Sequence, residues 1–283
     1  MTVLGAGRGP SLLGAVTLSL DEMQYLQERL GFDELPVVLD AMGRYDNAAE
    51  HDSAMIAAAA ALADRELLDG DIVHPELAAR LLALYRPHWV VALRWYVRDQ
   101  VNRLCVAKAE DPGSESGTLE VIALRGNASY VIDEAGHDLP GNVLAALGTV
   151  DALAIDAMNA PTAELTPIFD NAGDVTSTAA RLEQVCTPAR DAKTLAAALV
   201  RIDSHAEIVG IAYGDGIRTR VGDHLAVFDT RHGRLLAGSS LAEDGTEWTS
   251  LTGGTPARLR AALQKLIASL PLRQPFPDVD RPR

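Results

Sequence analysis

The 283-residue sequence has only two cysteines and lacks a long apolar run. Cys105 and Cys186 lie far apart and outside any Cys-x-x-Cys motif, which is typical of a reducing compartment and not of a disulfide framework. No apolar stretch approaches the roughly 20 residues that a membrane-spanning helix needs. No small-x-small cleavage pattern follows the apolar residues 12–20, so we expect a cytoplasmic protein without membrane insertion.

Basic residues are also scarce, and only three of them are lysines. The chain has 25 lysines and arginines against 39 aspartates and glutamates, which gives a net charge of −14. Binding to nucleic acid or to anionic lipid needs clustered cations, so this balance argues against both partners. Apolar residues make up 48% of the chain, an ordinary globular value, and a chain of this length can bury a core without disulfides or a structural metal.

Recognisable catalytic motifs are missing as well. The seven histidines form no His-Glu-x-x-His or His-x-His pattern, and the sequence has no Gly-x-Ser-x-Gly nucleophile elbow. One metal-dependent enzyme hypothesis stays open, in which His224, Asp229 and His232 meet across a hairpin. The sequence otherwise predicts a protein with no catalytic residues, no metal and no cofactor.

Helix and strand patterns occur in two similar series. In the first, the predicted elements are a strand within 12–20, a helix from Ser19 to Gly31, a short strand at 35–39, helices at about 46–68 and from Pro75, strands at 89–97, 101–108, 118–125 and 128–133, and a helix at about 139–148. Ser19 and Glu22 form a capping-box pattern, which begins a helix, and Gly31 is typical of a helix end.

The second series follows a stretch at 151–176 that we expect to be irregular. Its predicted elements are helices at about 176–186 and 188–202, strands at 205–213, 217–221, 224–230, 233–239 and 246–252, and a helix at 256–270 that Thr255 and Pro256 begin. The segments VIDEAG at 131–136 and VFDTRHG at 227–233 also look alike. The shared order indicates a duplicated unit.

We therefore expect an α+β fold with a central, mainly antiparallel sheet and a pseudo-twofold repeat of a helices–meander–helix unit. The predicted division is a flexible extension over 1–15, a first repeat over 16–150, a second repeat over 151–272 on the same sheet, and a tail over 273–283. A different interpretation uses 46–97, whose order has the outline of a winged helix. The chain would then be an acidic, non-catalytic adaptor or regulator that binds its partner through Arg80 and Arg86.

The C-terminal third carries a family resemblance. Its features are a strand ending in Asp229, a turn with Gly233 and Arg234, Trp248 on a strand, the run Gly254-Thr255-Pro256, and a helix that ends at Leu270-Pro271. Residues 224–240 (HLAVFDTRHGRLLAGSS) and 243–271 (EDGTEWTSLTGGTPARLRAALQKLIASLP) thereby resemble the end of the EspG family, the cytoplasmic chaperones of the mycobacterial-type ESX (type VII) secretion system. Over about 16–272 the order of elements agrees.

This resemblance implies a fold and a partner. Family members are expected to have a central sheet flanked by two helical bundles. They bind the exposed apolar tip of the PPE subunit in a PE–PPE heterodimer, keep it soluble and direct it to its ESX machine, without an enzymatic step or a cofactor. The resemblance thus implies a secretion chaperone from an actinobacterium, which we expect to be a monomer or a weak homodimer when free.

The partner-binding face is predicted on the second-half sheet and the helices of 176–202. The candidate contacts are apolar residues on these elements, namely Leu182, Val185, Leu195, Leu199, Leu225, Val227, Phe228, Leu235 and Leu236. Apolar residues in such positions are equally typical of an ordinary core.

Overall fold

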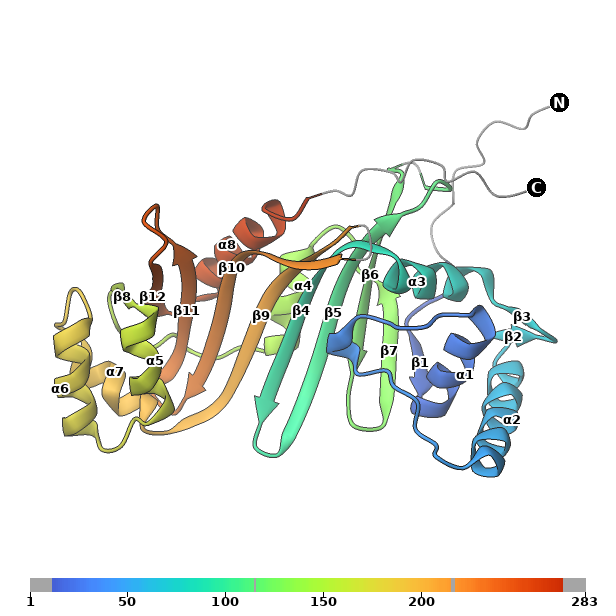
Figure 1. Cartoon of the computed structure of the whole chain (residues 1–283), viewed down its shortest axis with the longest axis horizontal. Helices are drawn as coiled ribbons and strands as arrows, with labels where there is room; N and C mark the ends of the chain where they lie inside the picture. Colours follow the sequence, from blue (N-terminus) through green and yellow to red (C-terminus); the bar gives the residue numbers. More distant parts are fainter. Residues whose placement is uncertain (1–11, 115, 215–216, 272–283) are drawn as a thin grey trace.

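One large antiparallel sheet forms the centre of the molecule (Figure 1). The computed structural model describes residues 12–114, 116–214 and 217–271. The ten strands of this sheet pair in the order β1 (Val16–Ser19), β7 (Ser129–Glu134), β6 (Thr118–Arg125), β5 (Gln100–Glu110), β4 (Pro87–Val97), β9 (Ile202–Gly214), β10 (Ile217–Thr230), β11 (Gly233–Leu241), β12 (Glu247–Gly253) and β8 (Met158–Pro161). Every pair is antiparallel, which confirms the predicted class.

The two halves of the sheet have the same strand order when each is followed from its outer edge to the centre. In both halves an edge strand is followed in the chain by helices, then by a four-stranded meander, then by one more helix. The halves join where β4 pairs with β9, from Trp89 opposite Ala212 to Val97 opposite Ser204. That the halves arose as a repeat, and that they divide near residue 150, stay predictions.

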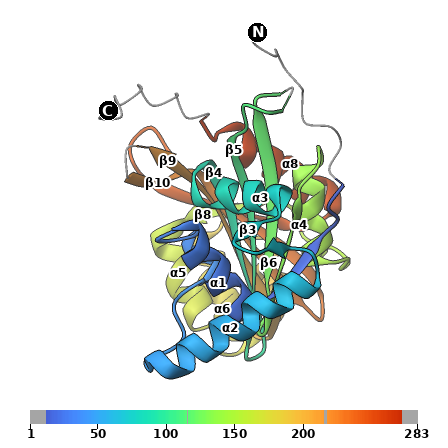
Figure 2. The ribbon, with the colours of Figure 1, turned by 90° about the vertical axis from the view of Figure 1, so that its right-hand side faces the viewer.

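Helices cover the two faces of the sheet differently (Figures 1 and 2). A first helical group packs on the first half and consists of α1 (Leu20–Leu30), the 3₁₀ turn η1 (Val37–Leu39), α2 (Ala48–Asp64) and α3 (Pro75–Tyr85), with the small hairpin β2 (Leu68–Asp69) and β3 (Ile72–Val73). A second helical group packs on the same face of the second half and consists of α5 (Thr162–Asp170), α6 (Val175–Val185) and α7 (Ala192–Leu199). The opposite face carries α4 (Leu139–Leu147) and α8 (Pro256–Ala268).

The core follows this arrangement. One apolar cluster lies between the sheet and the first helical group, a second lies beneath α4 and α8, and a third lies beneath the second helical group. Successive residues of a strand point to opposite faces, so each central strand contributes to clusters on both sides. On β4, for example, Val90 joins the first cluster and Val91 the second.

Local sequence signals fix the helix ends as predicted. The Glu22 backbone N–H donates to the Ser19 hydroxyl at 3.1 Å, and the Ser19 N–H donates to the Glu22 carboxylate at 2.6 Å, which completes the capping box. Gly31 ends α1 with φ +67°, a conformation that favours glycine. At α8 the Arg258 N–H donates to the Thr255 hydroxyl at 3.2 Å.

Two predicted segments are corrected by the structure. Residues 35–39 form the turn η1 and not a strand: the Leu39 N–H donates to the Pro36 carbonyl at 2.8 Å, and Pro36 has no N–H for a strand ladder. Residues 151–176 are irregular only in part: 151–157 and 171–174 lie outside the helices and strands, whereas 158–170 hold β8 and α5, and α6 begins at Val175. Prolines at the start of α5 and within it, Pro161 and Pro167, hid that helix.

Other boundaries shift. The predicted strands 217–221 and 224–230 are one strand, β10, whose pairing with β9 changes register around Gly222, where φ is +76°. The helix predicted at 188–202 is confined to α7.

The predicted terminal extension and tail fall mostly outside the described residues. Of the extension, residues 12–15 are described, and the carbonyls of Leu13 and Gly14 accept hydrogen bonds from the buried Arg80 guanidinium. In the described ranges, no helix is both long enough and apolar enough to span a bilayer.

Candidate partner-binding surface

The middle of the sheet is left uncovered between the two helical groups (Figure 1). We call this surface the open face. Its first feature is a row of aromatic side chains from β4, β9, β10 and α5, namely Tyr96, His205, Phe228 and Phe169. Ring centroids lie 4.5 Å apart for Tyr96 and His205, 6.2 Å for His205 and Phe228, and 5.4 Å for Phe228 and Phe169. All four side chains are half-buried, so each ring keeps surface for a partner.

Strand register explains this row. Tyr96 lies opposite His205, and His205 lies opposite Phe228, so the three rings stand side by side on one face. Phe169 reaches Phe228 from α5 because the second helical group packs on this same face. The row therefore crosses from the first half of the sheet to the second.

A hollow continues the aromatic row under α5. Its volume is about 170 Å³, and its lining comes from α5 and three strands: Thr162, Leu165, Thr166, Phe169, His224, Ala226, Phe228, Ala237, Ser239, Glu247 and Thr249. Hydroxyls of Thr162 and Thr249 hydrogen-bond at 2.8 Å at one end. Burial, and then the nearby Arg220, lower the pKa of His224, which favours a neutral imidazole in the hollow. The apolar part of the hollow is suited to a protruding aliphatic or aromatic side chain.

Most of the candidate contacts lie in the core. Seven are buried, namely Leu182, Leu195, Leu199, Leu225, Val227, Leu235 and Leu236, whereas Val185 and Phe228 are half-buried. Leu225 and Val227 pack beneath α4 and α8, on the far side of the sheet from the open face. Of the nine, Phe228 lies in the aromatic row. Whether any of the nine touches a partner stays a prediction.

The sequence contained a signal that separates these residues. Val227 and Phe228 are consecutive on a strand, so they point to opposite faces and cannot both contact one partner. Tyr96, His205 and Phe169 were not predicted, because they belong to separate elements and only the register brings them together.

The metal-dependent enzyme hypothesis is contradicted by the geometry. His224 faces the open side, whereas Asp229 points to the opposite face and is bound by Arg234, with Nε to Oδ1 at 2.6 Å. His232 is exposed in the turn after β10. The predicted convergence of these three side chains is therefore wrong. Over the described part of the chain, no three His, Cys, Asp or Glu side chains are grouped to hold a metal ion.

The cysteines and Arg80 are enclosed. Burial raises the pKa of the Cys105 thiol, and it raises that of Cys186 to about 11, so neither is poised as a thiolate nucleophile. Arg80, a proposed contact of the adaptor interpretation, is fully buried and cannot meet a partner. Arg86 is exposed and lies over the Tyr85 ring at 5.4 Å.

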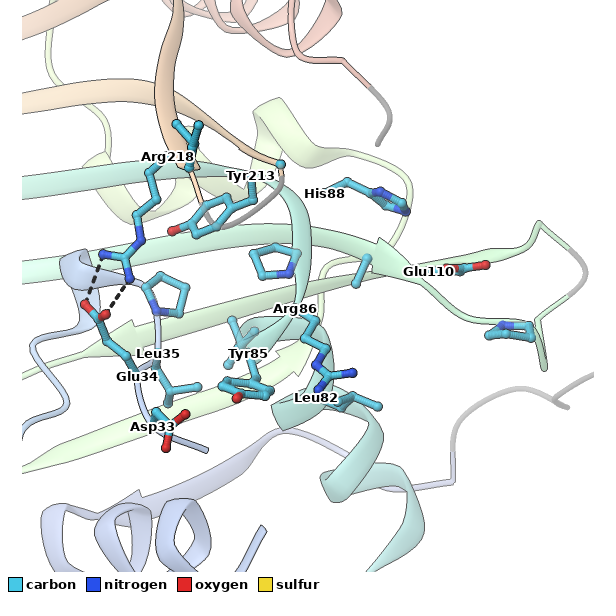
Figure 3. Close-up of a pocket in the computed structure, with 17 residues that line it drawn as sticks. Asp33, Glu34, Leu35, Leu82, Tyr85, Arg86, His88, Glu110, Tyr213 and Arg218 are labelled. Atoms are coloured by element: carbon cyan, nitrogen blue, oxygen red, sulfur yellow. Dashed lines mark hydrogen bonds and ion pairs between the residues drawn. The ribbon is translucent and has the colours of Figure 1, made fainter. Parts of the chain in front are cut away.

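A larger cavity of about 760 Å³ lies at the ends of the central strands that are farther from the aromatic row (Figure 3). The loop after α1, the end of α3 and the β9–β10 hairpin line it. Arg218 and Glu34 point toward each other there and form a two-bond ion pair, one bond of which measures 3.0 Å. The Arg218 guanidinium lowers the pKa of Glu34, so this carboxylate is held ionised. Asp33, Glu110 and His88 lie at separate places around the cavity and do not converge on one point.

Comparison with known proteins identifies a family for this sequence. Residues 19–265 match the sequence model of the EspG family. The ESX-3 secretion-associated protein EspG3 of Mycobacterium tuberculosis is 26% identical over 295 residues, which cover 93% of this chain and 94% of that protein. EspG3 of Mycolicibacterium smegmatis is 38% identical over 76 residues, about 26% of each chain.

A solved structure shares the fold. It is the Mycobacterium tuberculosis type VII secretion system chaperone EspG5 in complex with a PE25–PPE41 dimer. The TM-score is 0.71 at 18% identity, and the match covers 91% of this chain and 97% of that one. Because the family match extends over most of the sequence, and the sheet with its two helical groups is that of a solved relative, this chain belongs to the EspG family.

Proposed function

We propose that this chain is a secretion chaperone for a PPE-type client. It binds the exposed apolar helical tip of the PPE subunit in a PE–PPE heterodimer, keeps that tip soluble and directs the pair to its ESX type VII secretion system. Family membership supports the proposal, as does the solved relative, a chaperone in complex with PE25–PPE41. The observation that carries it is the aromatic row on the open face.

The open face has the physical properties that such a task needs. A helical tip with exposed apolar side chains tends to self-associate, and a chaperone prevents this by covering them. The half-buried rings of Tyr96, His205 and Phe228 offer apolar area, and exposed Arg94 and Glu207 lie beside them as a polar rim. A stable specific complex buries roughly 1,200–2,000 Å² in total, so the client would also touch the edges of both helical groups.

The nine predicted contacts divide into two roles under this proposal. Phe228 and Val185 keep exposed area and would touch the client. The seven buried residues would act indirectly, because they hold the second helical group and the strands in place beneath the open face. Tyr96, His205 and Phe169 join the direct contacts.

The proposal includes a non-catalytic role and a cytoplasmic location, before export of the client. An ESX-3 type system is the first to test, because the relative matched along most of its length is an ESX-3 secretion-associated protein.

Co-expression tests the proposal directly. The chain is produced with each PE–PPE pair of its own genome, and the products are separated by size exclusion. We expect a soluble 1:1:1 complex with at least one pair, and we expect Phe228→Ala to weaken it at least tenfold, as for a central interface aromatic. Ile56→Ala is the matched control, since Ile56 is 72% exposed on α2, and α2 lies toward the outer end of the first helical group (Figure 1). Failure with every pair, or equal effects of both substitutions, would refute the proposal.

A further inference from the structure

Three arginines lie side by side on one face of the sheet, from Arg94 on the open face to Arg125 beneath the first helical group. Arg94 on β4 is opposite Arg103 on β5, and Arg103 is opposite Arg125 on β6. We call these three residues the arginine row. Arg94 is two residues before Tyr96 on the same strand, so the arginine row runs beside the aromatic row, about 7 Å away. A chain of net charge −14 thus places clustered positive charge next to its apolar contact surface.

At one end of the arginine row a single carboxylate offsets part of the positive charge. Asp40 Oδ2 lies 3.3 Å from Arg103 Nη2 and 3.6 Å from Arg125 Nη2, so a single carboxylate oxygen bridges two neighbouring arginines. Arg125 also lies over the Tyr130 ring and donates from Nε to its hydroxyl at 3.1 Å. Like charges placed opposite each other on a sheet are destabilising, and Asp40 offsets that cost at this end.

The other end of the row is not neutralised in this way. Arg94 is exposed, and among the residues that the structure describes no carboxylate forms an ion pair with it. Glu207 is opposite Arg94 on β9, but the two do not form an ion pair. Arg94 therefore projects from the uncovered part of the sheet, between Arg103 and Glu207, with its guanidinium available to an incoming group.

We propose that Arg94, together with Arg103, determines client specificity by receiving a carboxylate of the PPE-type partner. The inference rests on the proposed function and names the chemistry that the open face selects. The partner's aspartate or glutamate bridges Arg94 and Arg103 as Asp40 bridges Arg103 and Arg125. It lies about 7 Å from the apolar side chain that packs on Tyr96, since this is the separation of the two rows. A tip without such a carboxylate leaves Arg94 without a counter-charge beside Arg103, whose charge Asp40 offsets only in part, and it is rejected.

Charge-altering variants of the chain test this inference, with the PE–PPE pair that co-purifies with the unaltered chain as the probe. Affinity is measured by calorimetry at 50 and 500 mM NaCl for the unaltered chain, Arg94→Gln and Arg94→Glu. We expect at least a tenfold loss for Arg94→Glu, a smaller loss for Arg94→Gln, and a weaker salt dependence in both. Arg258→Glu is the matched control, because this exposed arginine of α8 lies on the opposite face; its affinity should stay within twofold.

The decisive experiment combines Arg94→Glu with reversal of charge on the client. Acidic residues of the client's tip are replaced one at a time by arginine, and one of these clients should regain at least fivefold affinity for Arg94→Glu while losing affinity for the unaltered chain. Thermal unfolding of each variant excludes loss of fold. Equal affinity of Arg94→Glu and Arg258→Glu overturns the inference and leaves the proposed function intact. Absence of binding by the unaltered chain to every pair overturns both.

Discussion

Among the residues that the structure describes, each half of the molecule holds one fully buried arginine, and the two have different partners. In the first half, Arg80 of α3 donates to the carbonyls of Leu13 and Gly14, while the carboxylates of Asp133 and Glu134 lie farther off, at 3.6 and 3.8 Å. Those two carboxylates keep contact with water, with side chains 42% and 32% exposed. Arg80 thus ties an edge segment to the first helical group.

In the second half, Arg234 of β11 is held by a close pair of bonds. Its Nε and Nη2 donate to the two oxygens of Asp229 at 2.6 and 2.8 Å, and it also donates to the carbonyls of Leu147 and Gly148, both at 2.9 Å. These carbonyls end α4, which follows the first-half meander. Arg234 therefore fastens the first half of the chain to the second, and the open face, which spans both halves, depends on that connection.

The largest effect should come from breaking this second-half ion pair. Arg234→Met leaves Asp229, whose side chain is only 13% exposed, without its partner, and it leaves two helix-end carbonyls unsatisfied. We expect the free energy of unfolding to fall by about 3–5 kcal/mol, measured by urea denaturation. Arg80→Met should cost less, about 1–3 kcal/mol, because the nearby carboxylates can be hydrated.

Arg201→Met is the control for this comparison. Arg201 is 71% exposed and lies 3.7 Å from Asp203, so its loss should change stability by less than about 1 kcal/mol. An Arg80→Met variant that loses as much stability as Arg234→Met would show that exposure of the acidic partner does not decide the cost.

A second comparison distinguishes residues that stabilise the second helical group from residues of the open face that bind the client. Leu195 on α7 is fully buried, so Leu195→Ala should cost about 2–5 kcal/mol of unfolding free energy while the folded fraction still binds the client. Tyr96→Ala should do the reverse, with a loss of client affinity of tenfold or more and a small change in stability, because Tyr96 keeps exposed area. Parallel urea denaturation and calorimetry distinguish the two. Loss of affinity by folded Leu195→Ala with Tyr96→Ala unaffected would move the contact surface onto α7.

The sequence predicted well what short-range rules control. The capping box at Ser19 and the cap at Thr255 each act within one helical turn, and both helix starts were predicted correctly. The meander strands were found because the alternation of apolar residues needs no knowledge of their partners. Pro167 inside α5 broke the local rule, and tertiary packing of Leu165 and Ile168 overrode it.

The candidate surface was beyond those rules. Tyr96, His205 and Phe228 meet only because β4 pairs with β9 and β9 pairs with β10, and no local pattern encodes that register. The arginine row was not predicted for the same reason, because its members lie on three strands. In addition, the overall charge of −14 argued against a basic cluster.

The smallest expected effect is on the pH dependence of stability, where one histidine from each half is compared. The ring nitrogens of His51 on α2 lie within hydrogen-bond distance of the Glu28 and Asp52 carboxylates, which accept from the protonated imidazole and raise its pKa. A raised pKa contributes stability that is fully present below the unfolded value near 6.5 and is lost as pH rises through the folded value. His224 in the hollow has a lowered pKa because of burial and then Arg220, so the unfolded chain takes up its proton first. Its contribution to stability therefore falls as pH decreases below about 6.5 and levels off below the folded pKa.

Opposite pH trends are thus expected for His51→Gln and His224→Gln when urea denaturation is repeated from pH 5 to 8. Relative to the unaltered chain, His51→Gln should be least stable at pH 5 and recover toward pH 8. His224→Gln should gain relative stability toward pH 5. At that pH the unfolded chain carries a proton on His224, so folding of the unaltered chain must either bury a charged imidazole beside Arg220 or give up that proton. Trends of the same sign in both variants would contradict the assignment of a neutral imidazole to the hollow, and would leave the open face with one more positive charge than the arginine row supplies.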